Sequence, residues 1–166
     1  MKRYAMLVLA AALMAGCGSR EEKTTLQGVE EKGNQYISQG MKYLGQSDIP
    51  RAIQSFDQAI KQEPNNPSHY IVLGQVYMRL KNYARAVDSL LGAVRVDPMN
   101  GEAYYLLAVS QELLGNKDKA VEAAQKSVEI FMSKKEEEKF KQSVTLLKSL
   151  MQQQSAAQTP PQAQEK

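Results

Sequence analysis

Few side chains in this sequence could act as a nucleophile, a general base or a soft metal ligand. Among its 166 residues, His69 is the only histidine and Cys17 is the only cysteine. A histidine-based catalytic triad would depend on His69 alone, and a zinc site needs more nitrogen and sulfur ligands than these two residues supply. We expect His69, which follows Pro67 and Ser68 at the start of a helix, to face solvent. The sequence therefore predicts no catalytic residue, no metal site and no cofactor.

Other patterns that can support chemistry have a simpler explanation here. The three adjacent glutamates at 136–138 stand among lysines at 134, 135 and 139, which is typical of a solvated helix face. The 10 glycines occur singly, so the sequence has no glycine-rich loop of the kind that binds phosphate. An enzyme that acts on a small-molecule substrate is therefore not expected.

Cys17 follows a segment that has the layout of a secretory signal. Lys2 and Arg3 precede 13 uncharged residues, 4–16, which are too few to span a bilayer as a helix. The segment ends in the letters LMAG directly before the cysteine. This ending resembles the bacterial lipobox, in which the signal is cleaved before the cysteine, although Met14 stands where leucine is usual.

The resemblance to bacterial lipoproteins implies a signal peptide at 1–16 and a mature chain that begins with Cys17 as the lipid attachment site. Such a cysteine carries acyl chains, palmitate among them, that hold the protein on a membrane. Gly18 follows it, rather than the aspartate that retains some lipoproteins in the inner membrane, so the resemblance implies an outer-membrane protein that faces the periplasm. The alternatives for Cys17 are a lone buried or surface thiol and a reactive nucleophile.

The charge that remains is nearly balanced. Without Lys2 and Arg3, the 21 basic residues become 19 against 18 acidic ones, a formal charge of +1, so the composition does not favour binding to nucleic acid. Residues 17–28 are polar and lack apolar periodicity, so we expect a flexible tether behind the lipid. Residues 152–166 are rich in glutamine and contain two adjacent prolines, which predicts a disordered tail, with a proline-rich ligand motif as the alternative.

Between these ends, similar residues recur at a spacing of 34. Each interval carries two small residues and a tyrosine, and a proline closes the first two intervals: the sets are Ala52, Ala86 and Ala120; Gly40, Gly74 and Ala108; Tyr36, Tyr70 and Tyr104; and Pro64 and Pro98. Apolar residues within each interval follow helical spacing, and small residues allow two antiparallel helices to approach closely. Strand patterns are absent from the sequence, so an all-α fold is expected.

This pattern resembles the tetratricopeptide repeat, a helix-turn-helix unit that stacks into a right-handed solenoid. The resemblance covers three units, 33–66, 67–100 and 101–134, within a solenoid expected over 29–151. It implies that repeat packing depends on Gly40, Ala52, Pro64, Gly74, Ala86, Pro98, Ala108 and Ala120. The third unit departs from the pattern, with Gln111 and Ser127 in the places of a tyrosine and an alanine.

Polar residues at the breaks are expected to begin the helices. Asp48, Asn82 and Asn116 each precede the second helix of a unit and can cap it, and Asn66 can cap the helix that starts at Pro67.

One more helix is predicted after the third unit, at 135–151. Ser133 and Glu136 have capping-box spacing. An apolar stripe with helical spacing follows: Phe140, Val144, Leu147 and Met151. We expect this stripe to cover the exposed apolar side of the last unit, as the end of a solenoid requires; docking of a partner is the alternative.

In tetratricopeptide folds the first helix of each unit lines a concave groove. By register, the resemblance implies that a protein or peptide segment binds along Asn34, Ile37, Met41, Leu44, Ser68, Ile71, Gln75, Met78, Glu102, Tyr105, Val109 and Glu112. Apolar residues and methionines in a concavity favour binding, although Ile71 and Val109 could equally pack between units. Chaperone-tail binders of this family clamp carboxylates with basic residues and asparagine, and the matching places here hold residues such as Ile37, Met41 and Leu106. An acidic C-terminal peptide is therefore not expected.

Together these features predict a membrane-anchored protein–protein interaction scaffold or adaptor in the bacterial envelope. Its architecture resembles pilotin-like and envelope-assembly lipoproteins, which implies a role in assembly or localisation of an outer-membrane machine such as a secretin or pilus complex. An adaptor that recruits periplasmic cell-wall hydrolases is the alternative.

Overall fold

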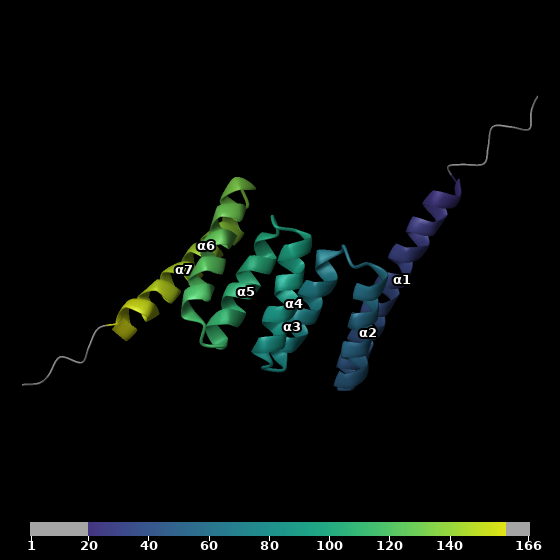
Figure 1. Ribbon diagram of the computed structural model, residues 1–166, viewed down its shortest axis with the longest axis horizontal. Coiled ribbons are helices and arrows are strands. Elements are labelled where there is room, and N and C mark those ends of the chain that lie inside the picture. The colour runs from purple at the N-terminus through teal and green to yellow at the C-terminus, as the bar shows by residue number, and fades with distance from the viewer. Residues whose placement is uncertain (1–19, 159–166) are drawn as a thin grey trace, which may run out of the picture.

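The computed structural model describes residues 20–158, and all regular structure in this range is helical. Its seven helices are α1 (Arg20–Gly45), α2 (Ile49–Gln62), α3 (Pro67–Arg79), α4 (Tyr83–Val96), α5 (Gly101–Leu113), α6 (Lys117–Ser133) and α7 (Glu137–Gln158). They form three antiparallel hairpins that stand side by side in an elongated row, with α7 at one end (Figure 1). The predicted all-α helix-turn-helix solenoid is confirmed. The predicted signal peptide 1–16, Cys17 and residues 159–166 of the predicted tail lie outside the described residues.

Within each hairpin, small residues lie where the two helices are closest. A Cβ atom added at Gly40 would lie 2.6 Å from the Phe56 ring, and one added at Gly74 would lie 2.8 Å from Leu90 Cγ. The alanines at 52, 86, 108 and 120 are completely buried. A larger side chain at any of these positions would push the helices apart.

The two prolines of the repeat pattern lie outside the core. Pro64 and Pro98 are exposed and lie in the turns that join α2 to α3 and α4 to α5. Proline has no backbone N–H and cannot continue a helix interior, so these residues end helices rather than fill the core. The Pro64 carbonyl oxygen accepts a hydrogen bond from the Tyr70 hydroxyl at 3.1 Å, which ties the turn to α3.

Three of the four expected N-caps make the hydrogen bond. Asp48 and Asn82 accept from backbone N–H groups three residues on, both at 3.3 Å, and Asn66 accepts from Ser68 N at 3.1 Å. Asn116 makes no cap hydrogen bond; its side-chain amide instead donates to Gln111 Oε1 at 2.7 Å.

Both end helices are longer than expected. α1 begins at Arg20, so most of the predicted tether is helical; the sequence of this segment contains good helix formers. α7 continues to Gln158, past the predicted start of the tail at residue 152. Gln154 Nε2 donates to Asp118 Oδ1 at 2.6 Å, which fastens this end of α7 to α6.

The packed face of α7 coincides with the predicted stripe only in part: Leu147 packs against the core cluster, and Phe140 and Val144 are half-buried. Ser143 and Leu150 are buried against the preceding unit, whereas Met151 is 52% exposed. Ser143 is accommodated because its hydroxyl lies 2.8 Å from that of Ser127, which donates to the Gly101 carbonyl at 3.1 Å. The proposed capping box is wrong, since the Ser133 hydroxyl donates to Ile130 O and closes α6 instead.

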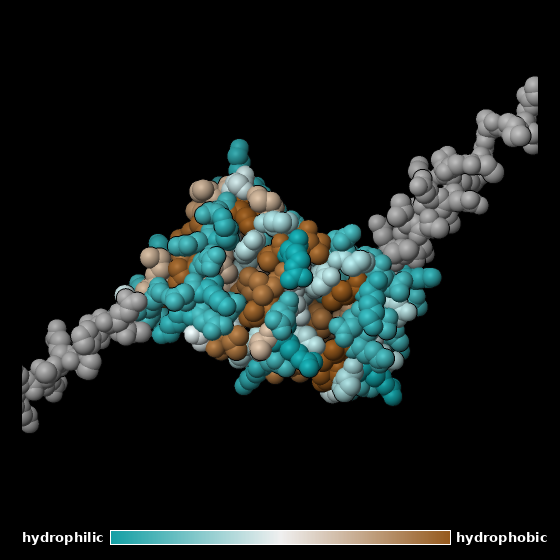
Figure 2. Space-filling view, in the orientation of Figure 1, coloured by the Kyte–Doolittle hydropathy of each residue, from teal (hydrophilic) through white to brown (hydrophobic). Residues whose placement is uncertain are grey.

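Apolar surface on the face shown in Figure 2 gathers in the furrows in the middle of the solenoid, and polar side chains cover much of the rest. None of the helices between residues 20 and 158 is long and apolar enough to cross a bilayer.

Candidate partner-binding groove

The twelve groove candidates fall into three classes of exposure. Asn34, Met41, Ser68 and Glu102 are exposed; Ile37, Leu44, Gln75, Met78, Tyr105, Val109 and Glu112 are half-buried; and Ile71 is buried. Ile37, Leu44 and Met78 touch the hydrophobic clusters that hold the hairpins together. The candidates therefore include both surface positions and residues fixed by packing.

The alternative left open for Ile71 is resolved in favour of packing. Its side chain is 8% exposed and lies in a cluster with Ala93 of α4 and Ala103 of α5. Ile71 joins the second unit to the third, so a partner could touch it only if the units separated. Val109 is half-buried and lies in none of the buried clusters.

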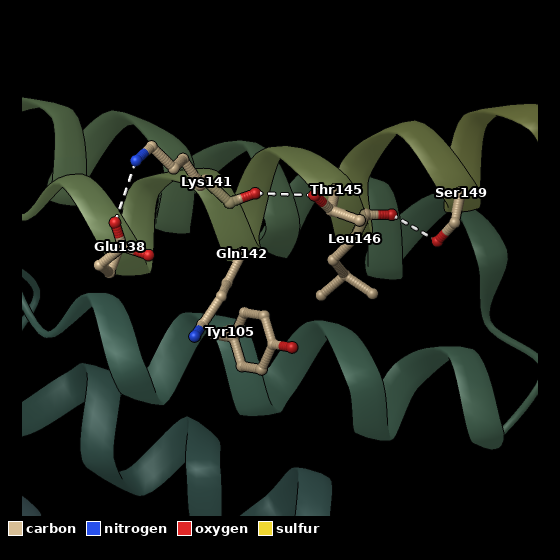
Figure 3. A pocket seen from close by; sticks show the side chains of 7 residues that line it. All are labelled: Tyr105, Glu138, Lys141, Gln142, Thr145, Leu146 and Ser149. Atoms are coloured by element: carbon tan, nitrogen blue, oxygen red, sulfur yellow. Dashed lines mark hydrogen bonds and ion pairs between the residues drawn. The ribbon is translucent and has the colours of Figure 1, made fainter.

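A pocket lies between α5 and α7, with a volume of about 370 Å³. Its lining comes from one residue of the third unit and six of α7: Tyr105, Glu138, Lys141, Gln142, Thr145, Leu146 and Ser149. Figure 3 shows the side chains of Gln142 and Leu146 pointing from α7 towards the Tyr105 ring on α5. Tyr105 is thus a groove candidate that lines this pocket.

The α7 side of this pocket is absent from the sequence-based groove. α7 was expected to cover the last unit, with docking of a partner as the alternative, but no role was assigned to its individual polar residues. A signal was available: polar residues recur at 138, 141, 142, 145 and 149, which is helical spacing on one face. That face lies apart from the one formed by Ser143 and Leu150, so one helix can both close the solenoid and line a pocket.

Most polar side chains of the pocket form an ion pair or a hydrogen bond with another residue of α7. Lys141 Nζ donates to Glu138 Oε1 at 3.0 Å, and both side chains are well exposed. The Thr145 hydroxyl donates to Lys141 O at 2.9 Å and the Ser149 hydroxyl to Leu146 O at 2.8 Å. Figure 3 marks no hydrogen bond between Gln142 and the other six lining residues. The Gln142 amide can therefore offer both donors and an acceptor to a partner.

The expectation that His69 faces solvent is wrong. Its side chain is 3% exposed, with Nε2 3.8 Å from Glu63 Oε2. Helix α1 passes over the ring, because a Cβ added at Gly33 would lie 3.1 Å from His69 Cε1. Asn66 Nδ2 donates to Glu63 Oε2 at 2.8 Å and links the same group to the turn. His69 thus joins the first unit to the second. Among the described residues, no three acidic, histidine or cysteine side chains are placed to hold a metal ion.

A helix-turn-helix solenoid with an open face defines the class of this protein. The sequence pattern of the tetratricopeptide repeat matches residues 37–95 and, in a second register, residues 71–134. The chain belongs to the tetratricopeptide repeat family. Members of this family are in general protein-interaction modules rather than enzymes, so the protein is an interaction scaffold or adaptor in its broad class.

Solved structures share the fold at low sequence identity. The TPR2B-domain:pHsp70 complex of yeast Sti1 is 20% identical, with a TM-score of 0.67 over 74% of this chain and 98% of that one. A type III secretion (T3SS) complex from Aeromonas hydrophila is 14% identical, with a TM-score of 0.69 over 82% of this chain and 99% of that one. PcrH in complex with the chaperone binding region of PopD is 15% identical, with a TM-score of 0.65 over 80% and 95%. No curated protein sequence matches the chain.

Proposed function

We propose that the protein is a lipid-anchored adaptor of the bacterial envelope that binds a segment of another protein between α5 and α7. The pocket around Tyr105 carries this proposal, because it combines an aromatic side chain with a polar wall from α7. Aromatic residues in partly enclosed positions contribute a large share of binding energy at interfaces. One of the similar structures holds PcrH in complex with the chaperone binding region of PopD, which is compatible with segment binding.

The proposed anchor is Cys17, which follows a basic and apolar signal. Since α1 begins at Arg20, only two residues separate the cysteine from a continuous helix. α1 has 26 residues and α2 has 14, so about 18 Å of α1 projects past its partner at 1.5 Å per residue. Figure 1 shows this start of α1 extending beyond α2. We infer that a helical stalk, rather than a flexible tether, holds the solenoid away from the membrane.

The anchor is tested by changing the cysteine. Cys17→Ser should abolish incorporation of labelled palmitate, leave a larger unprocessed protein and remove the chain from the outer-membrane fraction. Ser19→Ala, two residues further on, should be labelled and sorted like wild type. Normal maturation and outer-membrane location of Cys17→Ser would show that the lipoprotein proposal is wrong.

The binding site is tested by site-specific cross-linking in cells. A photoreactive amino acid at Gln142 should capture a partner protein, whereas the same group at Asp88, an exposed residue of α4, should capture much less. The partner's identity then separates assembly of a secretin or pilus complex from recruitment of a cell-wall hydrolase. Equal capture at both positions, or none at Gln142, contradicts the assignment of the groove.

A further inference from the structure

The chemistry of the pocket between α5 and α7 restricts what it can bind. Its floor is apolar, formed by the Tyr105 ring and the Leu146 side chain (Figure 3). Its only charged groups are Glu138 and Lys141, which pair with each other at 3.0 Å. The remaining lining residues, Gln142, Thr145 and Ser149, are neutral. No unpaired positive charge faces the pocket, so its lining does not complement an acidic side chain or a C-terminal carboxylate.

The hydroxyl groups of Thr145 and Ser149 present oxygen lone pairs rather than protons. A serine or threonine hydroxyl has one proton to donate and two lone pairs with which to accept. Thr145 and Ser149 each donate to a carbonyl of their own helix, at 2.9 and 2.8 Å. Their remaining capacity is to accept, so the complementary group on a partner is an N–H donor.

The spacing of these acceptors suits an extended chain. Residues four apart on a helix are separated by about 6 Å along its axis. In an extended chain, N–H groups that point to the same side recur every second residue, at about 6.6 Å. A helical partner would not match, because its own N–H groups beyond the first turn are bonded within the helix.

We propose that this pocket binds an uncharged segment in extended conformation, read mainly through its backbone. Two alternate main-chain N–H groups donate to Thr145 Oγ1 and Ser149 Oγ, and the Gln142 amide bonds a further peptide group. One apolar side chain of the segment lies between Tyr105 and Leu146. The inference rests on the proposed function of this groove and adds the conformation and charge of the partner.

The experiment uses the full chain and two displayed libraries of random 12-residue peptides. In one library the peptides have free C-termini, and in the other both ends of each peptide are fused to the carrier protein. Both libraries should yield peptides that are uncharged around one apolar residue. A synthetic peptide of the consensus sequence should bind wild type, and Thr145→Val or Ser149→Ala should weaken it about three- to tenfold, as expected for one lost hydrogen bond. Ser133→Ala removes a similar hydroxyl–carbonyl bond at the end of α6 and should leave affinity unchanged.

A second measurement replaces the main-chain N–H groups of the peptide. N-methylation at two alternate residues should lower affinity at least tenfold, and methylation at the residue between them should have a smaller effect. Selection of acidic peptides or of free C-terminal carboxylates, helix formation on binding, or insensitivity to both α7 substitutions would overturn this inference while leaving a binding groove. If no peptide is enriched, the inference also fails; the proposed function fails with it only if cross-linking at Gln142 captures nothing.

Discussion

The middle unit, α3–α4, and the terminal unit, α5–α6, follow the same repeat but are held together differently. In the middle unit, Gly74 lies directly against Leu90, and the Tyr77 hydroxyl accepts a hydrogen bond from Arg85 Nη1 at 3.4 Å. In the terminal unit, Gln111 occupies the position of Tyr77; it is buried and accepts from Asn116 Nδ2. The terminal unit thus adds a buried polar contact to its own apolar cluster, which includes Leu107 and Ala124.

These polar contacts lie where the regular stacking ends. The hydroxyl of Ser127 contacts both the Gly101 carbonyl in α5 and the Ser143 hydroxyl in α7. Buried polar groups are costly unless they find partners, so each such contact favours one arrangement of the helices over others. The departures of the third unit from the repeat pattern are therefore matched to α7, which also lines the pocket. The comparison indicates that both units have an apolar core and that the terminal unit adds polar contacts that fix the position of α7.

The largest expected effect is in the apolar middle unit. Leu90 is fully buried, while its neighbour Leu91 is 40% exposed. Leu90→Ala should lower the free energy of unfolding by about 2–5 kcal/mol, because it removes buried apolar surface and leaves a cavity beside Gly74. Leu91→Ala should cost well under half as much. Urea unfolding followed by circular dichroism measures both, and similar midpoints for the two variants would contradict this account of the core.

A smaller effect is expected from the buried serines. Ser127→Ala removes the bonds to α5 and α7 and should cost about 1–2 kcal/mol, because it leaves buried polar groups without partners. Ser89 is comparably enclosed in the middle unit, but its hydroxyl donates only to Arg85 O of its own helix, at 3.0 Å. Ser89→Ala should therefore be nearly neutral.

The double change tests whether the two serines act as a pair. Because Ser143→Ala removes the partner left behind, the free-energy cost of Ser127→Ala plus Ser143→Ala should be less than the sum of the two single costs. Thermal unfolding of the three variants measures this coupling. If Ser127→Ala is as mild as Ser89→Ala, the terminal unit does not depend on polar contacts in the way proposed.

The sequence predicted contacts within hairpins better than contacts between them. Gly74 and Leu90 are 16 residues apart in the same unit, and the repeat places both on facing helices. By contrast, His69 is buried by α1 near Gly33, and the Ser127 hydroxyl of the third unit contacts the Ser143 hydroxyl of α7, 16 residues away. Such contacts depend on how successive units are stacked, which periodicity alone does not specify.

The same limitation applies to the candidate site. Register correctly identified Tyr105 as a residue of the first-helix face, and the structure places it in the pocket. It did not show which residues of α7 are buried most deeply, because only apolar residues were assigned to the packed stripe. In the structure, Ser143 is buried and Met151 is exposed; the Ser143 hydroxyl lies 2.8 Å from that of Ser127, and this hydrogen bond offsets the cost of burying it.

The smallest effect is expected at the end of α7. Gln154 Nε2 donates to Asp118 Oδ1 across to α6, but both groups are exposed, so the bond should contribute less than about 1 kcal/mol. Gln154→Ala should barely change the midpoint of global unfolding, yet the last turns of α7 should open more often. Hydrogen exchange of the backbone amides between residues 152 and 158 should accelerate about two- to fivefold. Gln153 is exposed on the same turn, and Gln153→Ala should not accelerate exchange. Equal exchange in the two variants would mean that helix propensity alone, rather than contact with the terminal unit, extends α7 past the predicted start of the tail.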